Sequence, residues 1–150
     1  MSKIIKVGIK YGLLAGVILF GLIQLVPYGR QHTNPPVVQE PNWDDVQTRQ
    51  LAVEACYDCH SNEVNWPWYS NVAPVSWLVQ RHVNKGRREL NFSEWEEKDN
   101  RPKMARELSK EIRKGKMPLR SYLITHPEAR LTAEQRQQLV DGLTVTVNGQ

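Results

Sequence analysis

Two cysteines and a histidine lie within five consecutive residues, in the run Cys56-Tyr57-Asp58-Cys59-His60. The spacing Cys-x-x-Cys-His is the attachment pattern of a c-type haem. Two thiols separated by two residues at a helix end can each form a thioether with one vinyl group of a porphyrin, and the adjacent histidine then faces the iron. The pattern therefore predicts one covalently attached haem c, with His60 as an iron ligand.

Three other uses of a Cys-x-x-Cys pair compete with this interpretation. A thioredoxin-like dithiol would need a βαβ setting, and the sequence shows no such pattern. A zinc site would need a second ligand pair, whereas the chain has no further cysteine and its other histidines are scattered at His32, His82 and His126. A structural disulfide would close a loop too short to add much stability, and it would leave His60 without a role.

Met117 is the residue best suited to the second axial position of the iron. It follows a charged helical pattern and precedes Pro118, whose fixed φ angle favours a rigid turn that can hold a thioether in place. The alternative is that Met117 simply fills a gap in the core, as we expect for Met104 on its helical stripe. His82, His126 or an open coordination site are the other possibilities for this position.

The N-terminal segment has the pattern of a membrane anchor. Its charged residues are Lys3, Lys6 and Lys10, and nineteen uncharged positions, 11–29, follow them. A helix of that length spans about 28 Å, close to the thickness of the bilayer hydrocarbon. We expect a transmembrane helix that contacts lipid through residues 11–29, with a cleaved signal peptide or a buried helix of a soluble domain as the alternatives. Because the lysines precede the span, the positive-inside rule places the rest of the chain on the periplasmic side of a bacterial inner membrane.

The rest of the chain is nearly neutral. The protein has 20 basic and 16 acidic residues and a net charge of +4, but three of the bases precede the span. Without a concentrated basic face, the sequence gives no reason to expect nucleic-acid binding. A length of 150 residues fits one domain and an anchor, and excludes a multidomain enzyme. Two cysteines exclude a disulfide-dense scaffold.

Short helices are expected to position the Cys-x-x-Cys-His motif. Residues 1–29 form the anchor, the proline-rich residues 30–41 predict an extended linker, and residues 42–150 predict the haem domain. In that domain, Asn42 is placed to cap a helix that ends at the motif. A second helix should begin at Pro74, after a loop.

The C-terminal part predicts three more helices. Ser93 with Glu96 matches a capping box, residues 102–114 show helical spacing, and Thr132 opens the last helix with a second capping-box match. The β-branched run 144–147 is unusual in a helix, so we expect the last helix to stop before it. The sequence shows no alternation typical of strands, and the fold class is therefore all-α. A large apolar cofactor would complete the thin core of such a domain.

Two blocks of this sequence resemble a known family. Residues 56–95 contain WPWYSNVAPVSWL and LNFSEW, and residues 116–132 read KMPLRSYLITHPEARLT. They closely resemble the small bacterial haem-binding domain family of membrane-attached, cytochrome-c-like proteins. The resemblance covers nearly all of residues 42–143 and implies a c-type cytochrome fold.

That similarity also implies roles for four residues. Cys56 and Cys59 would attach the haem, with His60 as the proximal and Met117 as the distal ligand. Such an iron stays six-coordinate in both oxidation states, which favours an electron carrier and not an enzyme. Its partners would be membrane or periplasmic redox proteins. The alternative is a haem-based sensor or a peroxidase-like enzyme with a labile Met117, in which His82 or His126 supplies the acid–base group.

An aromatic group lies in the first of these blocks. Trp66, Trp68, Tyr69 and Trp77 could line the haem crevice, with an indole N–H or the Tyr69 hydroxyl reaching a propionate. We take Trp68, Tyr69 and Trp77 as candidate haem contacts; ordinary core and loop packing is the alternative. Arg81, Arg87 and Arg88, on the helix that follows, could also serve propionates, but we interpret them as part of a solvated face.

Overall fold

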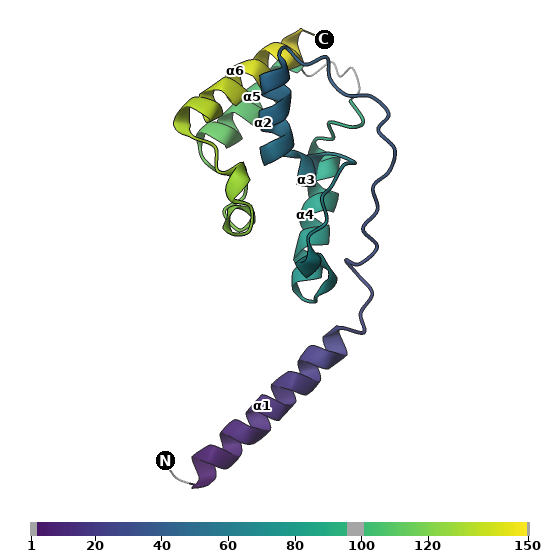
Figure 1. Ribbon diagram of the computed structural model, residues 1–150, viewed down its shortest axis with the longest axis vertical. Coiled ribbons are helices and arrows are strands. Elements are labelled where there is room, and N and C mark those ends of the chain that lie inside the picture. Colours follow the sequence, from purple (N-terminus) through teal and green to yellow (C-terminus); the bar gives the residue numbers. More distant parts are fainter. Residues whose placement is uncertain (1–2, 96–100, 150) are drawn as a thin grey trace. The chain divides into compact units, whose positions relative to one another are not determined.

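The computed structural model describes residues 3–95 and 101–149, and all the regular elements in these two ranges are helical (Figure 1). The expectation of an all-α fold is therefore confirmed. Gln39 and Glu94 form an isolated parallel bridge. The elements are α1 (Lys3–Ile23), α2 (Val46–Ala55), α3 (Tyr57–His60), α4 (Val75–Glu89), α5 (Arg101–Arg113) and α6 (Ala133–Asn148), with the 3-10 turns η1 (Trp68–Asn71), η2 (Tyr122–Ile124) and η3 (Pro127–Ala129).

The chain divides into two compact units. The first comprises Met1–Thr33 and Trp66–His82, and the second comprises Asn34–Asn65 and Val83–Gln150. The boundary after His82 falls within α4. The motif Cys56–His60 and Met117 both belong to the second unit.

In the first unit, α1 is long and apolar enough to cross a membrane. Its span Ile5–Ile23 has 19 residues with a mean hydropathy of 1.7, and none of these residues is buried within the chain. The helix begins and ends earlier than the expected residues 11–29. After Ile23 the chain changes to the tighter i→i−3 hydrogen bonds of a 3-10 turn, from the N–H of Gln24 to the Gly21 carbonyl at 3.2 Å and from that of Leu25 to the Leu22 carbonyl at 3.0 Å.

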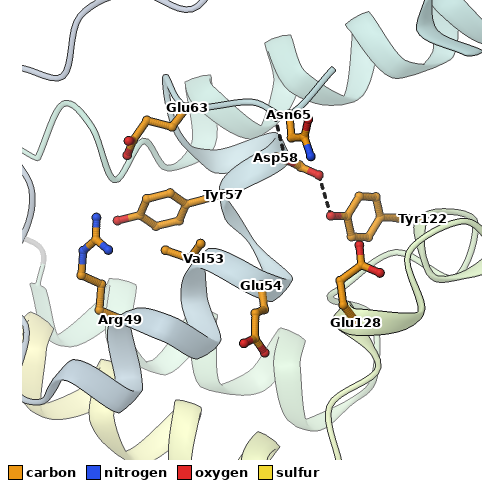
Figure 2. Close-up of a pocket in the computed structure, with 9 residues that line it drawn as sticks. All are labelled: Arg49, Val53, Glu54, Tyr57, Asp58, Glu63, Asn65, Tyr122 and Glu128. Atoms are coloured by element: carbon orange, nitrogen blue, oxygen red, sulfur yellow. Dashed lines mark hydrogen bonds between the residues drawn. The ribbon is translucent and has the colours of Figure 1, made fainter. Parts of the chain in front are cut away.

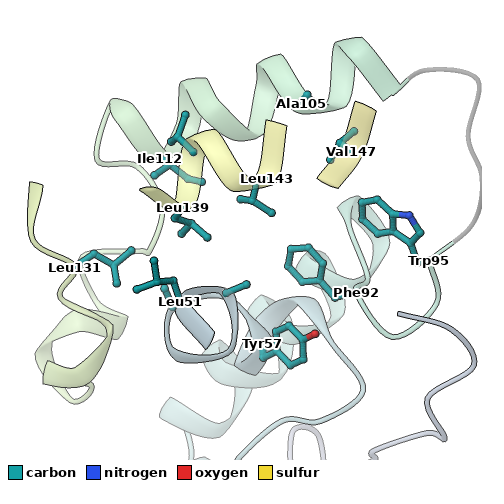
Figure 3. Packing of buried hydrophobic residues seen from close by; sticks show 13 residues of the cluster. Leu51, Tyr57, Phe92, Trp95, Ala105, Ile112, Leu131, Leu139, Leu143 and Val147 are labelled. Atoms are coloured by element: carbon teal, nitrogen blue, oxygen red, sulfur yellow. The ribbon is translucent and has the colours of Figure 1, made fainter. Parts of the chain in front are cut away.

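The core of the second unit lies where α2, α5 and α6 meet (Figure 3). Apolar side chains from all three helices are buried together, and the loop after α4 adds aromatic rings. Phe92 stacks on both Tyr57 and Trp95, with ring centroids 5.5 and 6.1 Å apart. The buried cluster includes Leu51, Ala52, Ala105, Ile112, Leu131, Leu139, Val140, Leu143 and Val147. Tyr57 adjoins Cys56, so the haem motif is built directly onto this core.

The helix α2 begins later than the sequence predicted. Asp45 occupies the N-cap position of α2, so the expected cap at Asn42 is wrong. The preceding turn is held by α6 instead, since the Asp44 N–H donates to Thr146 Oγ1 at 3.1 Å and the Thr146 hydroxyl donates to Asp44 Oδ1 at 3.0 Å. A long-range contact therefore fixes this turn, and local capping does not.

The last helix also departs from expectation. Its capping box at Thr132 and Gln135 is confirmed, but α6 runs through the β-branched residues to Asn148. Thr146 and Val147 are buried, and tertiary packing of this kind overrides the weak helix propensity of such residues. The short helix expected from Ser93 and Glu96 falls partly on residues 96–100, outside the described residues. The Ser93 hydroxyl accepts a hydrogen bond from the Asn62 N–H at 2.9 Å.

The proline-rich segment is extended, as expected, but it is held by many contacts. Val38 N–H donates to the Ser93 carbonyl at 2.9 Å, and the Trp95 N–H donates to the Gln39 carbonyl at 2.9 Å. Glu40 accepts two hydrogen bonds from Arg49, each of 2.8 Å, and one from Tyr57 at 3.0 Å. From Asn34 onward the segment is thus part of the second unit, which its composition did not indicate.

Candidate functional site

The two helices α2 and α3 meet at Cys56. The Cys56 N–H donates to the Ala52 carbonyl at 2.8 Å and so ends α2, while the Cys56 carbonyl accepts from the N–H groups of Cys59 at 3.1 Å and His60 at 2.9 Å. One helical turn therefore carries both thiols and the imidazole. The structure brings together the three residues that the spacing predicted.

Glycine at position 86 lets α4 pass very close to this turn. A Cβ atom on Gly86 would clash with the Cys59 carbonyl oxygen, so any larger residue forces α4 away. The turn is held from the same side by the Phe92 N–H, which donates to the His60 carbonyl at 2.8 Å. Arg87 Nε donates to the Ser61 carbonyl at 2.8 Å. The interpretation of Arg87 as a solvated surface residue is therefore wrong, because its guanidinium supports the end of α3.

The geometry of His60 fixes its tautomer. Nδ1 lies 3.1 Å from the Leu90 carbonyl oxygen, and a carbonyl can only accept, so Nδ1 carries the hydrogen. Nε2 then holds the lone pair that a metal ligand needs. Burial lowers the pKa of His60 and keeps the ring neutral. Metal-binding histidines usually donate their second nitrogen to a carbonyl or a carboxylate in this way. The residue therefore fits an iron ligand.

Both thiols are free, and their environment keeps them protonated. Burial raises the pKa of Cys56 to about 12 and, with the nearby Asp58 carboxylate, that of Cys59 to about 11. A redox-active dithiol needs the opposite, a pKa lowered towards neutrality. In residues 3–95 and 101–149 no strand pattern supports a thioredoxin-like unit, and these residues contain no group of three or more potential zinc ligands. These observations disfavour the first two competing uses of the motif.

Asp58, between the two cysteines, receives a hydrogen bond from a distant loop. The Tyr122 hydroxyl donates to Asp58 Oδ2 at 2.7 Å, and the Asn65 N–H donates to Asp58 Oδ1 at 2.9 Å (Figure 2). Burial and the Asp58 carboxylate both raise the pKa of Tyr122, so its hydroxyl keeps its proton. Sequence reasoning missed Tyr122, and its place five residues after Met117 was the single available signal.

The Tyr122 ring also contacts a polar pair formed by His126 and Glu128. It stacks on His126, with centroids 4.0 Å apart and an interplanar angle of 10°. His126 Nδ1 lies 2.8 Å from Glu128 Oε1. Tyr122 and Glu128 border a pocket of about 360 Å³ on the side of α2 and α3 shown in Figure 2. The pocket is lined by Arg49, Val53, Glu54, Tyr57, Asp58, Glu63, Asn65, Tyr122 and Glu128.

Met117 lies in a turn that is tied to the end of α5. The N–H groups of Lys116 and Met117 both donate to the Glu111 carbonyl, at 3.0 and 3.2 Å. The Met117 side chain is 36% exposed, whereas Met104 packs against the core as expected. The structure holds the Met117 backbone in place and leaves its thioether accessible. Its role as the distal ligand stays a prediction, as does the alternative of His82 or His126.

The candidate aromatic contacts lie in the first unit. Trp68 and Tyr69 form an edge-to-face pair with centroids 5.9 Å apart, and the Trp68 side chain is 78% exposed. Trp77 lies in the first half of α4, with its indole N–H buried. Contact of Trp68, Tyr69 and Trp77 with a haem stays a prediction.

Taken together, a small helical domain with two thiols and a carbonyl-oriented histidine on one turn has the features of a haem-binding domain. The comparison with protein families agrees. The chain belongs to the haem-binding domain family, whose model matches residues 18–145. This confirms the resemblance found in the sequence. A search of the curated proteins and a search of the solved structures each find no match to the chain.

Proposed function

We propose that this haem protein is a membrane-anchored c-type cytochrome that carries single electrons on the periplasmic face of a bacterial inner membrane. The observation that supports it best is the hydrogen bond between His60 Nδ1 and the Leu90 carbonyl, which leaves the Nε2 lone pair for iron on the turn that carries both thiols. Cys56 and Cys59 would hold haem c by two thioethers, and His60 and Met117 would be the axial ligands. A bound haem supplies reversible one-electron exchange.

The residues around the motif favour a rigid site. Gly86 lets α4 lie directly on Cys59, the Leu90 carbonyl orients the His60 ring, and the Phe92 N–H holds the His60 carbonyl. A carrier benefits from this rigidity, because little has to move when its charge changes.

The distal side is defined by the loop that carries Met117. This loop is fixed at one end by the Glu111 carbonyl and farther along by the Tyr122 hydroxyl on Asp58. A thioether held there would occupy the sixth position and exclude substrates. An electron carrier therefore follows from Met117 ligation, and an enzyme would require the loss of that ligand.

One observation favours a second candidate. His126 lies 2.8 Å from Glu128, and a histidine paired with a carboxylate is suited to acid–base chemistry. With Met117 displaced, such a pair would suit a peroxidase-like enzyme or a sensor of small ligands. Met117 is 36% exposed, so its side chain is not enclosed by the core.

Absorption spectra of the purified holoprotein separate the two candidates. The carrier predicts a six-coordinate low-spin spectrum and a weak methionine-to-iron charge-transfer band that is lost in Met117→Ala and kept in Met104→Ala. A five-coordinate spectrum with rapid binding of carbon monoxide would contradict the carrier and support the alternative.

Membrane anchoring is supported by α1 and by the three lysines at its start. The span Ile5–Ile23 is of sufficient length, and it contains Lys6 and Lys10 near its N-terminal end, where long basic side chains can reach the membrane surface; these lysines favour a cytoplasmic N-terminus. The account predicts that the chain stays in the membrane fraction after alkaline carbonate extraction. It also predicts that an alkaline phosphatase fused after residue 150 is active. A carbonate-soluble chain would contradict the anchor.

A further inference from the structure

Gln24, the first residue after α1, forms a pair of hydrogen bonds with the backbone of Ala73. Its Nε2 donates to the Ala73 carbonyl at 2.9 Å, and its Oε1 accepts from the Ala73 N–H at 2.9 Å. The carboxamide thus satisfies both backbone groups of one residue, 49 positions along the chain. Arg30 Nη2 also donates to Gln24 Oε1, at 3.1 Å. This pair joins the end of α1 to the loop before α4.

Two more contacts join the residues after α1 to the same part of the chain. Gly29 has a φ of 84°, and a Cβ atom on it would lie 2.5 Å from the Ser76 carbonyl oxygen, so the two backbones are in close contact. Farther on, His32 stacks on Trp66 with centroids 4.5 Å apart, and its Nε2 lies 3.1 Å from the Ser70 carbonyl oxygen. Residues 24–32 and 66–76 are therefore joined at several points within the first unit.

If α1 spans a bilayer, these contacts set the depth of residues 66–73 relative to the membrane surface. The helical span ends at Ile23, and Gln24 is the first polar residue after it, so we place its carboxamide near the end of the hydrocarbon. Ala73 is hydrogen-bonded to it and must lie at nearly the same level. The headgroup region adds about 5–8 Å on each side of the hydrocarbon, which is wide enough to hold a loop pinned in this way.

Among the large hydrophobic residues in the range 66–73, Trp68 is the exposed one. Trp68 is 78% exposed at the start of η1, five residues before Ala73. A single exposed apolar residue is ordinary on a protein surface. At the end of a membrane span it has a specific use, because tryptophan and tyrosine prefer the headgroup layer. Tyr28, which is 48% exposed, lies in residues 24–32, the other segment of the same contact.

We propose that residues 66–73 form a second membrane contact, in which Trp68 inserts into the headgroup layer of the leaflet where α1 ends. The partner is the lipid surface itself. This inference rests on the proposed membrane span of α1. As a consequence, the depth of the first unit in the membrane and its rotation about the axis of α1 are both fixed. The unit is then not connected to the membrane through a flexible linker.

The test uses full-length holoprotein labelled with 5-fluorotryptophan in lipid nanodiscs. The chain has five tryptophans, and Trp68→Phe identifies the resonance of Trp68 by its loss. Fluorine spectra are recorded with and without lipid that carries a gadolinium chelate on its headgroup. Attenuation is the intensity ratio of the two samples, so any effect of the haem iron cancels. We expect the headgroup chelate to attenuate Trp68 several-fold more than the same amount of soluble chelate does.

A matched pair of variants tests the role of the two hydrogen bonds between Gln24 and Ala73. Gln24→Ala removes both hydrogen bonds to Ala73 and should reduce the attenuation of Trp68, whereas Gln31→Ala, at an exposed glutamine seven residues on, should leave it unchanged. Equal attenuation of Trp68 by the headgroup chelate and the soluble chelate overturns the inference. Carbonate extraction of the same protein tells the cases apart: an inserted chain with an unattenuated Trp68 refutes this contact alone, and a soluble chain refutes the anchor as well.

Discussion

The hydroxyl of Tyr122 donates a 2.7 Å hydrogen bond to Oδ2 of Asp58, and the two residues are 64 positions apart. Asp58 lies between the two cysteines, and Tyr122 lies on the loop that begins with Met117. This bond therefore connects the turn that carries His60, the proposed proximal ligand, to the loop that carries Met117, the proposed distal ligand. It gives a physical reason why the two halves of a haem site could keep a fixed spacing.

Removing that bond should affect both stability and ligation. Tyr122→Phe leaves Asp58 with one bonding partner fewer, and we expect a loss of about 1–2 kcal/mol in the free energy of unfolding. If Tyr122 positions the loop, the methionine-to-iron band should weaken more than the Soret band. Tyr28→Phe, which removes the hydroxyl of a half-exposed tyrosine, is the control. An unchanged charge-transfer band in Tyr122→Phe would show that the loop is held in another way.

Gly86→Ala should distort the motif itself. The added methyl group meets the Cys59 carbonyl, so α4 must move, at a cost of about 1–3 kcal/mol in unfolding free energy. We also expect a lower yield of attached haem per polypeptide, measured from the ratio of Soret to protein absorbance. Gly16→Ala is the matched control, because nothing lies within 4 Å of its Cβ position. Equal haem content in the two variants would contradict the close packing of α4 on Cys59.

The Glu40 carboxylate should make stability depend on pH. The guanidinium of Arg49 holds the pKa of Glu40 below its usual range, with help from the Tyr57 hydroxyl. Because the folded-state pKa is lowered, its contribution is complete above the unfolded-state pKa and is lost as the pH falls through the folded-state value. Both side chains are partly exposed, so the effect is below about 1 kcal/mol.

The comparison of wild type with Glu40→Gln isolates the contribution of the Glu40 carboxylate to the free energy of unfolding. Urea unfolding of both proteins between about pH 3 and 7 should show the largest difference at the upper end and convergence at the lower end. Groups elsewhere, the buried His60 among them, cancel in the difference. If the difference in unfolding free energy between the two proteins grew as the pH falls, the Glu40 carboxylate would not stabilise the fold in its ionised form.

Thr146→Val should destabilise the end of α6. Valine keeps the β-branched shape but loses both hydrogen bonds to Asp44, which we expect to cost about 1–2 kcal/mol. Val145→Ala, at a neighbouring exposed position, should change the unfolding free energy by less than half of that. Helix content from circular dichroism, measured alongside urea unfolding, shows whether the tail of α6 frays first. Comparable losses in the two variants would mean that these hydrogen bonds contribute little.

The sequence indicated those parts of the site that depend on neighbouring residues. The motif at Cys56, Cys59 and His60 is recognisable from its spacing, and the capping box at Thr132 from local residue types. The bond from Tyr122 to Asp58 and the approach of Gly86 to Cys59 join residues far apart in the sequence, and no local pattern marks either one. The same holds for Thr146, whose burial carries α6 through residues of weak helix propensity. Local chemistry was predictable here, and tertiary positioning was not.

Covalent attachment of haem through Cys56 and Cys59 is the central claim, and extraction of the denatured protein tests it most directly. The chain is expressed with a cytochrome c maturation system, purified, treated with acid–acetone and analysed as its pyridine haemochrome. The account predicts that haem stays with the polypeptide, that its spectrum is that of two thioether bonds, and that Cys56→Ala with Cys59→Ala abolishes the attachment. Haem that leaves with the acetone, or attachment that persists in the double variant, would contradict it.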